Sequence, residues 1–459
     1  MPNQMPSIRE LARQIRTGQT TTVQIVDRCL QAIVEREKDI NAFITLLTDD
    51  AQAQARRTDE EIKRGEDRGF LHGIPISIKD IIDLDGVPTT AASAVRQGHR
   101  ATSDATVVAR LRAAGAIFIG KCNLHEFAFG TTGEDSAFGP TRNPHVPDRL
   151  AGGSSSGSAA SVAAGMALAS IGTDTGGSIR IPAAACGVVG LKPTQGELTT
   201  KGIVPLAPTL DHVGPLTNTV GDATLIYQVM AGGSVRVESN KVVRHTKQPR
   251  SQLGLLKSYF LDQVDADIRR SFEETLDHLR KVGYNIREVS IDHADTIATT
   301  YRLTQLYEAF QIHEHILETQ YEDYSPDVRD RLSLGRHVSE NDYHQMQVER
   351  AILQTEVDRS LGNIDALILP TLAIPAPKPG STQALIDGQF QDLRAVSLRL
   401  TQLFNLTGHP AISLPSGTTA AGVPCATQLV GQRHNTESLL QLASELEATL
   451  ESWQTFSRK

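Results

Sequence analysis

The chain has 459 residues, 39% of them hydrophobic, and a formal net charge of −8. This composition supplies enough apolar side chains for a sizeable core. The missing basic excess argues against a protein that binds the nucleic-acid backbone, so we expect no nucleic-acid partner.

Cysteine usage and hydropathy predict the compartment. The four cysteines, Cys29, Cys122, Cys186 and Cys425, form no CxxC pair, which is typical of reduced, buried thiols rather than a zinc site. The first residues, MPNQMPSIRELARQIR, lack the apolar stretch of a signal peptide. No run reaches the roughly 18 uncharged apolar residues of a membrane span. We therefore expect a cytoplasmic protein that has no membrane partner.

The first third of the chain predicts helices followed by strands. Residues 5–65 have helical spacing of apolar residues with one interruption, and NAFITLL at 41–47 predicts a short strand. GIPISIKDII at 73–82 alternates, which places Ile76 and Ile78 on one face of a strand and Lys79 on the other. A helix over 102–115 and a buried strand over 116–120 follow.

The rest of the chain predicts a loop and then further alternation of elements. Residues 130–158 are rich in turn residues, and 158–170 form a helix of small residues suited to close packing. Helical patterns, late strands and a polar boundary follow; in chain order they are the boundary 232–252, helices 264–283 and 296–360, strands 365–374, 410–415 and 426–431, and helix 437–450. This order predicts an α/β protein with a mixed sheet. We expect one domain, 1–459, with a helical insertion at 235–360.

Three short motifs match known sites but lack their context. Residues 115–122 resemble a phosphate-binding loop, yet AIFI in the middle predicts a strand rather than a loop. GSSSG at 153–157 matches GxSxG without the apolar strand that a nucleophile elbow requires. Asp211 and His212 are adjacent and cannot easily face each other as triad members. We interpret that pair as local turn and packing groups.

The segment GTDTGGSIRIPAAACG at 172–187 places Gly176 and Gly177 directly before Ser178. A serine hydroxyl needs a base to become a nucleophile, and a neutral lysine can serve. Lysine loses its proton near pH 7 only when it is buried or lies beside other cations. Lys79, in its apolar strand, is the best candidate. The alternative is that Lys79 forms an ion pair with Asp80 or Asp83.

The glycines before Ser178 suit an oxyanion hole. Acyl transfer develops an oxyanion that needs backbone N–H donors about 3 Å away. Thr175, Gly176, Gly177 and Ser178 supply successive N–H groups, and the glycines leave room for a substrate carbonyl. A second Gly/Ser cluster at 152–157 can bring another hydroxyl close.

Residues 152–183 resemble the signature block of the amidase signature family. The block is a Gly/Ser run, a small-residue helix and a D-x-G-x-S-I-R-x-P segment, and Ser156 stands where many members have glycine. The resemblance extends through most of the chain except about 235–360. The further matching segments are HGIPISIKD, GKCNLHEFAFG, SAFGPTRNP, GVVGLKPT, LDHVGPL and FNLTGHPAISLP.

This resemblance implies a large mixed sheet flanked by helices on both faces and a Ser–Ser–Lys triad. Ser178 would be the nucleophile, Ser154 a bridging serine held by a cis peptide bond, and Lys79 the base and later the acid. The implied reaction is hydrolysis of a small-molecule amide through a seryl acyl-enzyme, without metal or organic cofactor. Asp174 and Arg180 match the family's D and R, and we expect them to support the loop.

The type of family member is a separate question. The glutaminase subunit of tRNA-dependent amidotransferase carries an Asp ahead of its NLAG motif, whereas this chain has Leu398 seven residues before Asn405. The segment 196–215 also departs from that subunit. We therefore favour a free-standing amidase, with that glutaminase, a carbamate or urea-derivative hydrolase and a non-catalytic binding module as alternatives.

The substrate pocket and the oligomeric state are the least determined features. Phe127, Phe129, Gly130 and Thr131 are candidate pocket walls, although simple packing explains them equally well. Side chains at 306–312, namely Leu306, Tyr307, Phe310 and Ile312, fit a helix core better than a pocket lining. A homodimer stays open.

Overall fold

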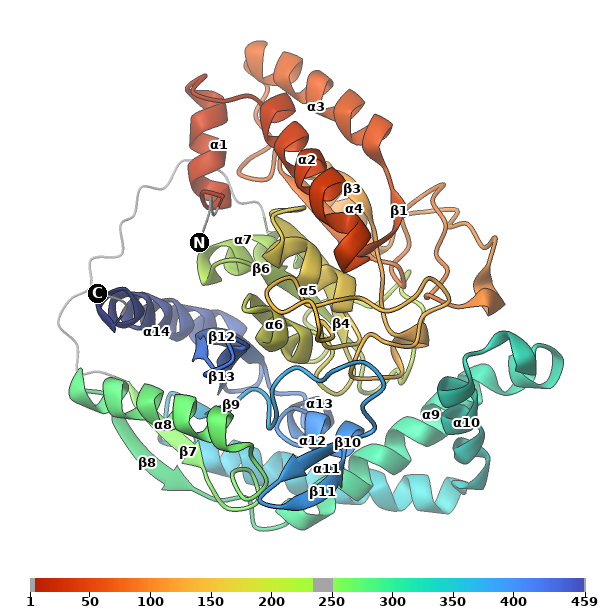
Figure 1. The fold of residues 1–459 in the computed structure, drawn as a ribbon, viewed down its shortest axis with the longest axis vertical. Coiled ribbons are helices and arrows are strands. Elements are labelled where there is room, and N and C mark those ends of the chain that lie inside the picture. The colour runs from red at the N-terminus through yellow and green to blue at the C-terminus, as the bar shows by residue number, and fades with distance from the viewer. Residues whose placement is uncertain (1–4, 234–250, 458–459) are drawn as a thin grey trace.

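The computed structural model describes residues 5–233 and 251–457. Its centre is a mixed sheet of 11 strands in the order β1-β3-β2-β4-β6-β5-β12-β13-β9-β7-β8, with β10 and β11 forming a separate hairpin (Figure 1). The strands are β1 Phe43–Leu46, β2 Pro75–Lys79, β3 Ile117–Cys122, β4 Ala169–Asp174, β5 Val189–Lys192, β6 His212–Thr217, β7 Gln252–Leu256, β8 Asn285–Val289, β9 Ala366–Pro370, β10 Gln383–Ile386, β11 Gln389–Asp392, β12 Ala411–Thr418 and β13 Pro424–Val430.

Helices cover both faces of this sheet, so the expected α/β class with a mixed, doubly covered sheet is confirmed. One core contains side chains of α1, α4, α7, α8 and α14, and the others contain those of α2, α3, α5, α6 and α11. The helices are α1 Ile8–Arg16, α2 Thr22–Ile40, α3 Thr48–Lys63, α4 Thr106–Ala113, α5 Ser156–Ala163, α6 Arg180–Cys186, α7 Val220–Met230, α8 Ala266–Lys281, α9 Ile297–Thr319, α10 Pro326–Leu334, α11 Glu340–Leu361, α12 Leu393–Leu398, α13 Leu403–Leu406 and α14 Thr436–Ser457.

Parallel pairing occurs on the two sides of the sheet, and antiparallel strands join them. Strand β2 pairs in parallel with β3 and β4, and β7 does so with β8 and β9. Strands β6, β5, β12 and β13 run antiparallel between these groups. Segments from both ends of the chain therefore complete one sheet.

The alternation predicted for β2 is confirmed. Ile76 and Ile78 enter the core that contains α4 and α7. Ser77 points the other way, and its hydroxyl lies 3.0 Å from that of Ser161 on α5. Every residue of β2 is buried, as is typical of a strand covered on both faces. Lys79 is consequently carried into the interior on the α5 side.

Helix α5 is central, as its small residues predicted, but it is shorter than expected. A Cβ on Gly157 would lie 2.1 Å from the Ala42 carbonyl oxygen, so only glycine allows this approach. The helix ends at Ala163, and Gly165 follows with φ +73°. The end of the predicted helix, Ala169 and Ser170, instead begins β4. This strand leads directly into the segment that contains Ser178.

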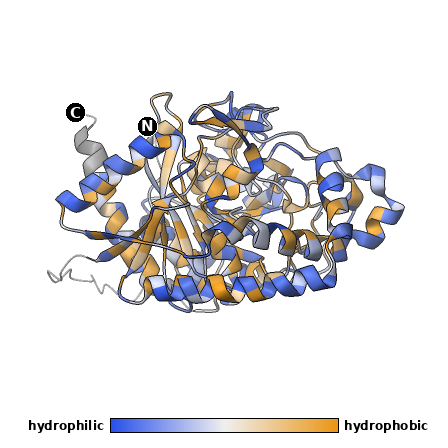
Figure 2. Ribbon diagram, turned by 90° about the horizontal axis from the view of Figure 1, so that it is seen from below, coloured by the Kyte–Doolittle hydropathy of each residue, from blue (hydrophilic) through white to orange (hydrophobic). Residues whose placement is uncertain are grey.

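The stretch expected as a helical insertion, 235–360, contributes to the sheet as well. Residues 234–250, including most of the predicted boundary, lie outside the described residues. Beyond them, β7 and β8 extend the sheet past β9, and only then do α9, α10 and α11 follow. Figure 2 shows mixed hydrophilic and hydrophobic positions along these helices. The helical expectation therefore missed two strands.

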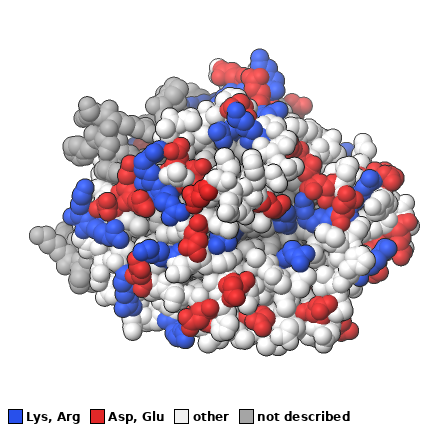
Figure 3. Space-filling model, turned by 60° about the horizontal axis from the view of Figure 1, so that its bottom comes forward, with Lys and Arg blue, Asp and Glu red and all other residues white. Residues whose placement is uncertain are grey.

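The four cysteines are buried and free. Burial raises the pKa of Cys29 to about 12 and those of Cys122 and Cys425 to about 11. Within the described ranges, no helix is long and apolar enough to cross a membrane. On the face drawn in Figure 3, acidic and basic side chains are interspersed rather than separated by sign.

Candidate active site

Lys79 stands at the end of β2 with its amine among hydroxyl groups. Its Nζ donates to Ser154 Oγ at 2.8 Å and to Thr173 Oγ1 at 2.7 Å. Burial lowers the pKa of Lys79 to about 7, against the opposing effect of the Asp174 and Asp211 charges. The amine can therefore be neutral at neutral pH.

The ion-pair alternative for Lys79 is wrong. Asp80 pairs with Lys121 Nζ at 2.9 Å and accepts a hydrogen bond from Thr90. In the part of the chain that the structure describes, no ion pair involves Lys79. Lys121 ends the strand that resembled a phosphate-binding loop, so that segment is a strand, as its apolar residues predicted.

Ser154 lies in a loop that neighbouring backbone holds in place. The Gly153–Ser154 peptide bond is cis, as the family resemblance implied. The Gly153 N–H donates to the Thr131 carbonyl at 2.7 Å, and the His125 N–H donates to the Ser154 carbonyl at 3.1 Å. Ser155 points elsewhere, since its hydroxyl donates to the Thr173 carbonyl at 3.1 Å. Of these two serines, Ser154 is thus the partner of Lys79.

Ser178 lies in the turn between β4 and α6. It is only 5% exposed, and its carbonyl accepts a hydrogen bond from the Ser155 N–H at 3.1 Å. The two Gly/Ser segments are therefore joined directly, and the second one carries Ser154. The structure brings together the three segments that contain Lys79, Ser154 and Ser178.

The backbone of the 176–178 turn has its carbonyl groups bonded and its N–H groups free. The carbonyls of Gly176, Gly177 and Ser178 accept hydrogen bonds from Thr401 Oγ1, the Ile181 N–H and the Ser155 N–H, at 2.5, 2.7 and 3.1 Å. Among the described residues, no acceptor bonds to the N–H groups of Gly176, Gly177 or Ser178. Three donors in a row are available to an anion beside Ser178.

The two glycines are required by the protein's own packing. A Cβ on Gly176 would lie 2.1 Å from Tyr301 Oη and 3.0 Å from Leu398 Cδ2. Gly177 has φ +140°, and a Cβ there would lie 2.3 Å from Thr401 Oγ1. The sequence interpretation gave the glycines to the approach of a substrate. The structure adds that buried side chains already occupy the space where side chains of residues 176 and 177 would be.

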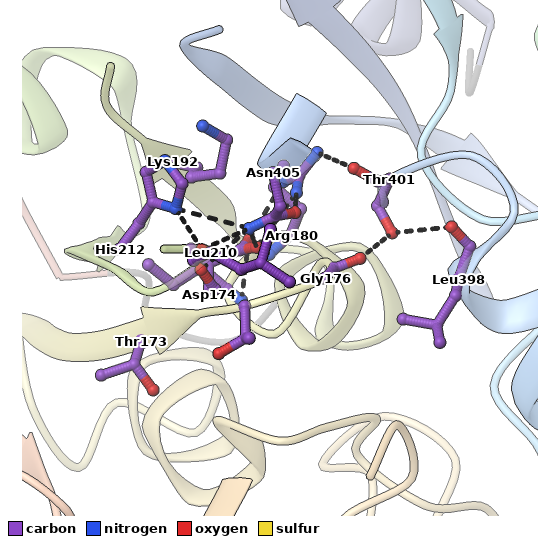
Figure 4. A network of polar contacts seen from close by, with 12 residues as sticks. Thr173, Asp174, Gly176, Arg180, Lys192, Leu210, His212, Leu398, Thr401 and Asn405 are labelled. Carbon is purple, nitrogen blue, oxygen red and sulfur yellow. Dashed lines mark hydrogen bonds and ion pairs between the residues drawn. The ribbon is translucent and has the colours of Figure 1, made fainter. Parts of the chain in front are cut away.

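A buried polar network supports this turn (Figure 4). Arg180 and Asp174 form an ion pair at 3.0 Å, and both side chains are fully buried. Burial acts to raise the pKa of Asp174, but Arg180 holds it below its ordinary value. Arg180 also donates to Asn405 at 2.7 Å and to Gln428 at 2.6 Å, and Asn405 donates to the Asp174 carbonyl at 2.9 Å. These contacts agree with the supporting role expected for Asp174 and Arg180.

Sequence reasoning did not single out Asn405, Gln428 or Thr401, although Asn405 lies in the motif FNLTGHPAISLP. It also underrated Asp211. That carboxylate accepts from two local backbone N–H groups, as a turn residue would, but also from Thr175 Oγ1 at 2.6 Å. Burial raises the pKa of Asp211 to about 6. Asp211 thus fixes the side chain of Thr175, the first predicted oxyanion residue.

The predicted pocket residues divide into two groups. Phe127 packs its ring against those of His313 and Tyr324, and Phe129 is fully buried. Gly130 and Thr131 line a cavity of about 500 Å³.

The expectation for the side chains at 306–312 can be compared with α9. Leu306 and Phe310 belong to the large hydrophobic core. Tyr307 stacks on Tyr343 with ring centroids 4.4 Å apart. These residues are therefore core and inter-helix contacts, as expected.

One cluster near this cavity has the residue types of a metal site. The donor atoms of His125, Asp135 and Asp327 lie within 4.8 Å of one another. Asp135 lies 3.2 Å from His125 Nε2, and Asp327 is bonded to Arg331. Ion pairs therefore account for both carboxylates, and we assign no metal to the cluster.

The fold and this grouping of serines around a buried lysine are those of a serine–lysine hydrolase. The family model Amidase matches residues 24–440. The chain belongs to the amidase family. The family, the α/β fold and the class of enzyme, a hydrolase of carbon–nitrogen amide bonds, were all predicted from the sequence and are confirmed.

Full-length relatives carry two different names. An amidase from Pseudomonas putida is 38% identical over 430 residues, which cover 92% of this chain and 91% of that protein. A glutamyl-tRNA(Gln) amidotransferase subunit from Carboxydothermus hydrogenoformans is 34% identical over 481 residues, which cover 97% of each. A crystal structure of an amidase superposes with a TM-score of 0.91 at 36% identity, and covers 97% of this chain and 100% of its own.

Proposed function

We propose that the protein is a free-standing amidase in which Lys79, Ser154 and Ser178 are the catalytic residues. The observation that carries this proposal is the 2.8 Å contact between the Lys79 amine and Ser154 Oγ, in a buried site where the lysine pKa is about 7. A lysine that is neutral near pH 7 can accept a proton, which a lysine with its ordinary pKa cannot do.

The reaction follows from these positions. Ser178 Oγ attacks the amide carbonyl carbon while its proton passes to Ser154, whose own proton passes to Lys79 Nζ. The resulting ammonium returns a proton through Ser154 to the leaving nitrogen, so that the C–N bond breaks and ammonia or an amine departs. Water then attacks the acyl-enzyme by the same route, and the carboxylic acid is released.

The turn before Ser178 supplies the electrostatic part. The tetrahedral intermediate places a negative charge on the former carbonyl oxygen, and donors about 3 Å away stabilise it. The free N–H groups of Gly176, Gly177 and Ser178 are the donors that we assign to this oxygen. We extend the assignment to Thr175, whose side chain Asp211 holds.

The side chain of Leu398 favours the free-standing enzyme. In the glutaminase subunit the corresponding position is the Asp that holds the amino group of glutamine. Here Leu398 is 6% exposed and packs beside Gly176, within the same buried layer as Tyr301. An ammonium group placed against this apolar side chain would lose its hydration without an ionic partner. We therefore propose a substrate without an amino group at this point.

The glutaminase subunit is the second candidate, because its relative matches 97% of the chain at 34% identity. Ammonia release from glutamine, measured with and without the other subunits of an amidotransferase, tests it. Glutamine turnover that depends on those subunits would replace the free-standing reading.

The experiment that tests the proposed function combines activity with labelling. A panel of aliphatic, aryl and amino-acid amides, with carbamates and ureas, is assayed for released ammonia or amine. The wild type should hydrolyse amides and react with a fluorophosphonate probe, and Ser178→Ala should do neither. Ser154→Ala should reduce both more than Ser155→Ala. Normal labelling of Ser178→Ala would contradict the choice of nucleophile.

Reduced thiols and the N-terminal composition lead us to propose the cytoplasm as the site of action. We propose a small-molecule amide as the partner, and we leave a homodimer open.

A further inference from the structure

Thr401 lies between α12 and α13 and contacts the turn that carries the oxyanion donors. Its side chain is fully buried. Thr401 Oγ1 donates to the Gly176 carbonyl at 2.5 Å, and the Leu398 carbonyl lies farther away, at 3.3 Å. Figure 4 shows the Gly176 carbonyl directed at this hydroxyl. The reaction sequence above does not use Thr401.

The bonded carbonyl and one of the free donors belong to the same peptide group. The carbonyl of Gly176 and the N–H of Gly177 lie in one plane and, in a trans peptide, point in opposite directions. A hydroxyl that fixes the carbonyl on one side of the turn therefore directs the N–H to the other side. In the described part of the chain, this N–H donates to nothing.

This peptide group needs an anchor because of its neighbours. It is flanked by glycine on both sides, and glycine permits backbone rotations that other residues resist. If the group turned over, the Gly176 carbonyl would replace the Gly177 N–H. A carbonyl oxygen there would repel an oxyanion instead of stabilising it.

Thr401 is itself held from several directions. Its N–H donates to the Leu398 carbonyl at 3.0 Å, and its carbonyl accepts from Arg180 Nη1 at 3.1 Å. Its Cβ lies 2.8 Å from the position that a Cβ on Gly177 would take. The hydroxyl therefore cannot move away from the turn without disturbing the Arg180 network.

We propose that Thr401 is a positioning residue, whose hydroxyl keeps the Gly177 N–H available to the oxyanion. This inference rests on the proposed function, since it assumes that Ser178 reacts and that the turn binds the developing charge. Thr401 touches neither the substrate nor the reacting atoms. It acts on the rate through the orientation of one peptide group.

A purely structural role would give a different result on substitution. If the hydroxyl only stabilises the fold, its loss should lower the unfolding temperature and leave the chemistry of the folded enzyme unchanged. If it positions the donor, its loss should slow the reaction step and leave ground-state binding nearly unchanged. The two roles separate when rate and affinity are measured apart.

The test measures the rate of fluorophosphonate labelling in three variants of the full chain. Phosphonylation puts the P=O oxygen in the place of the oxyanion, so it reports on the same donors without knowledge of the substrate. The maximal labelling rate is separated from the probe affinity by its concentration dependence. Thr401→Val keeps the shape without the hydroxyl, and Thr401→Ser keeps the hydroxyl.

Thr275→Val is the matched control. Thr275 is also fully buried, and its hydroxyl donates to one backbone carbonyl, that of Ser271, at 2.9 Å in α8. Its substitution removes the same kind of hydrogen bond away from the turn. Unfolding temperatures of all variants, measured by circular dichroism, show how much stability each change costs.

We expect Thr401→Val to lower the maximal labelling rate by about 10- to 100-fold, somewhat less than the roughly 10²–10³-fold loss on deleting an oxyanion donor. Probe affinity should change less than about threefold. Thr401→Ser should restore at least a third of the wild-type rate, and Thr275→Val should label like the wild type. Wild-type labelling by Thr401→Val, or equal slowing in Thr275→Val, would overturn the inference.

The wild type and Ser178→Ala are run beside these variants. If Ser178→Ala labels normally, the proposed function fails, and the inference fails with it. If Ser178→Ala is inert and Thr401→Val labels normally, only the inference fails. The two failures are therefore distinct.

Discussion

Lys79 gives the reaction its pH dependence. Its pKa is lowered to about 7 by burial, and the base must be neutral to accept a proton. The neutral form predominates above the pKa, so kcat/KM should rise with pH through about 7 and level off above it.

The labelling rate of Ser178, measured from pH 5.5 to 9, should show the same ascending limb. Lys79→Met, which keeps the length of the side chain without the amine, should remove that limb together with nearly all activity. A labelling rate in the wild type that is flat between pH 6 and 8 would contradict the assignment of Lys79 as the base.

Gly177 should be intolerant of any side chain. Its φ is +140°, and a Cβ would lie 2.3 Å from Thr401 Oγ1 and 2.8 Å from Ile181 Cδ1. Gly177→Ala should therefore reduce activity by more than about 100-fold and lower stability by an amount typical of backbone strain, ~1–3 kcal/mol.

Gly165→Ala is the control for this substitution. Gly165 also has positive φ, +73°, but a Cβ there would meet nothing within 4 Å. This variant should lose some stability and keep its activity. Activity and urea unfolding of both variants distinguish the two cases, and an active Gly177→Ala would show that the turn can shift without harm.

At the scale of elements, regular alternation and unbroken helical spacing were the readable signals. The alternating isoleucines of β2 identified both the strand and the face on which Lys79 lies. The spacing in 264–283 and 437–450 identified α8 and α14. Strand β4 escaped because its first residues, Ala169 and Ser170, continue a run of small side chains that suits a helix as well.

The site was predictable to the extent that its residues lie in recognisable motifs. Lys79, Ser154 and Ser178 could be selected because a buried lysine and two Gly/Ser segments are unusual. The contacts of Thr401 and Asp211 were not predictable, because they join turns far apart in the sequence through single hydrogen bonds. Only the fold brings those turns together.

Arg180 joins β4, α6, α13 and β13 through its hydrogen bonds. Removing one partner of a buried ion pair leaves the other charge unpaired, at a cost of ~3–5 kcal/mol. Arg180→Met should accordingly lower the free energy of unfolding by several kcal/mol. Asp174→Asn combined with Arg180→Met should cost less than the sum of the single changes. Additive losses in a double-mutant cycle would show that the pair is not coupled.

On the scale of the whole molecule, the sheet makes the chain one structural unit. Strand β9, which follows the helical stretch, lies between β13 and β7. The stretch 252–361 therefore cannot be removed without exposing the edge of β9. We expect a single thermal transition by calorimetry and no active product from deletion of this stretch. Two separate transitions would instead indicate that β7, β8 and the helices fold as an independent unit.

The burial of all four cysteines has a practical consequence for labelling experiments. Thiol reagents attack the thiolate, and burial keeps these thiols both protonated and out of reach. Ellman's reagent should therefore detect no thiols in the native enzyme and four after denaturation, and iodoacetamide should leave activity intact. A single cysteine introduced at the exposed Val348 on α11 would then be the one position to accept a fluorophore or spin label, without removal of any native cysteine.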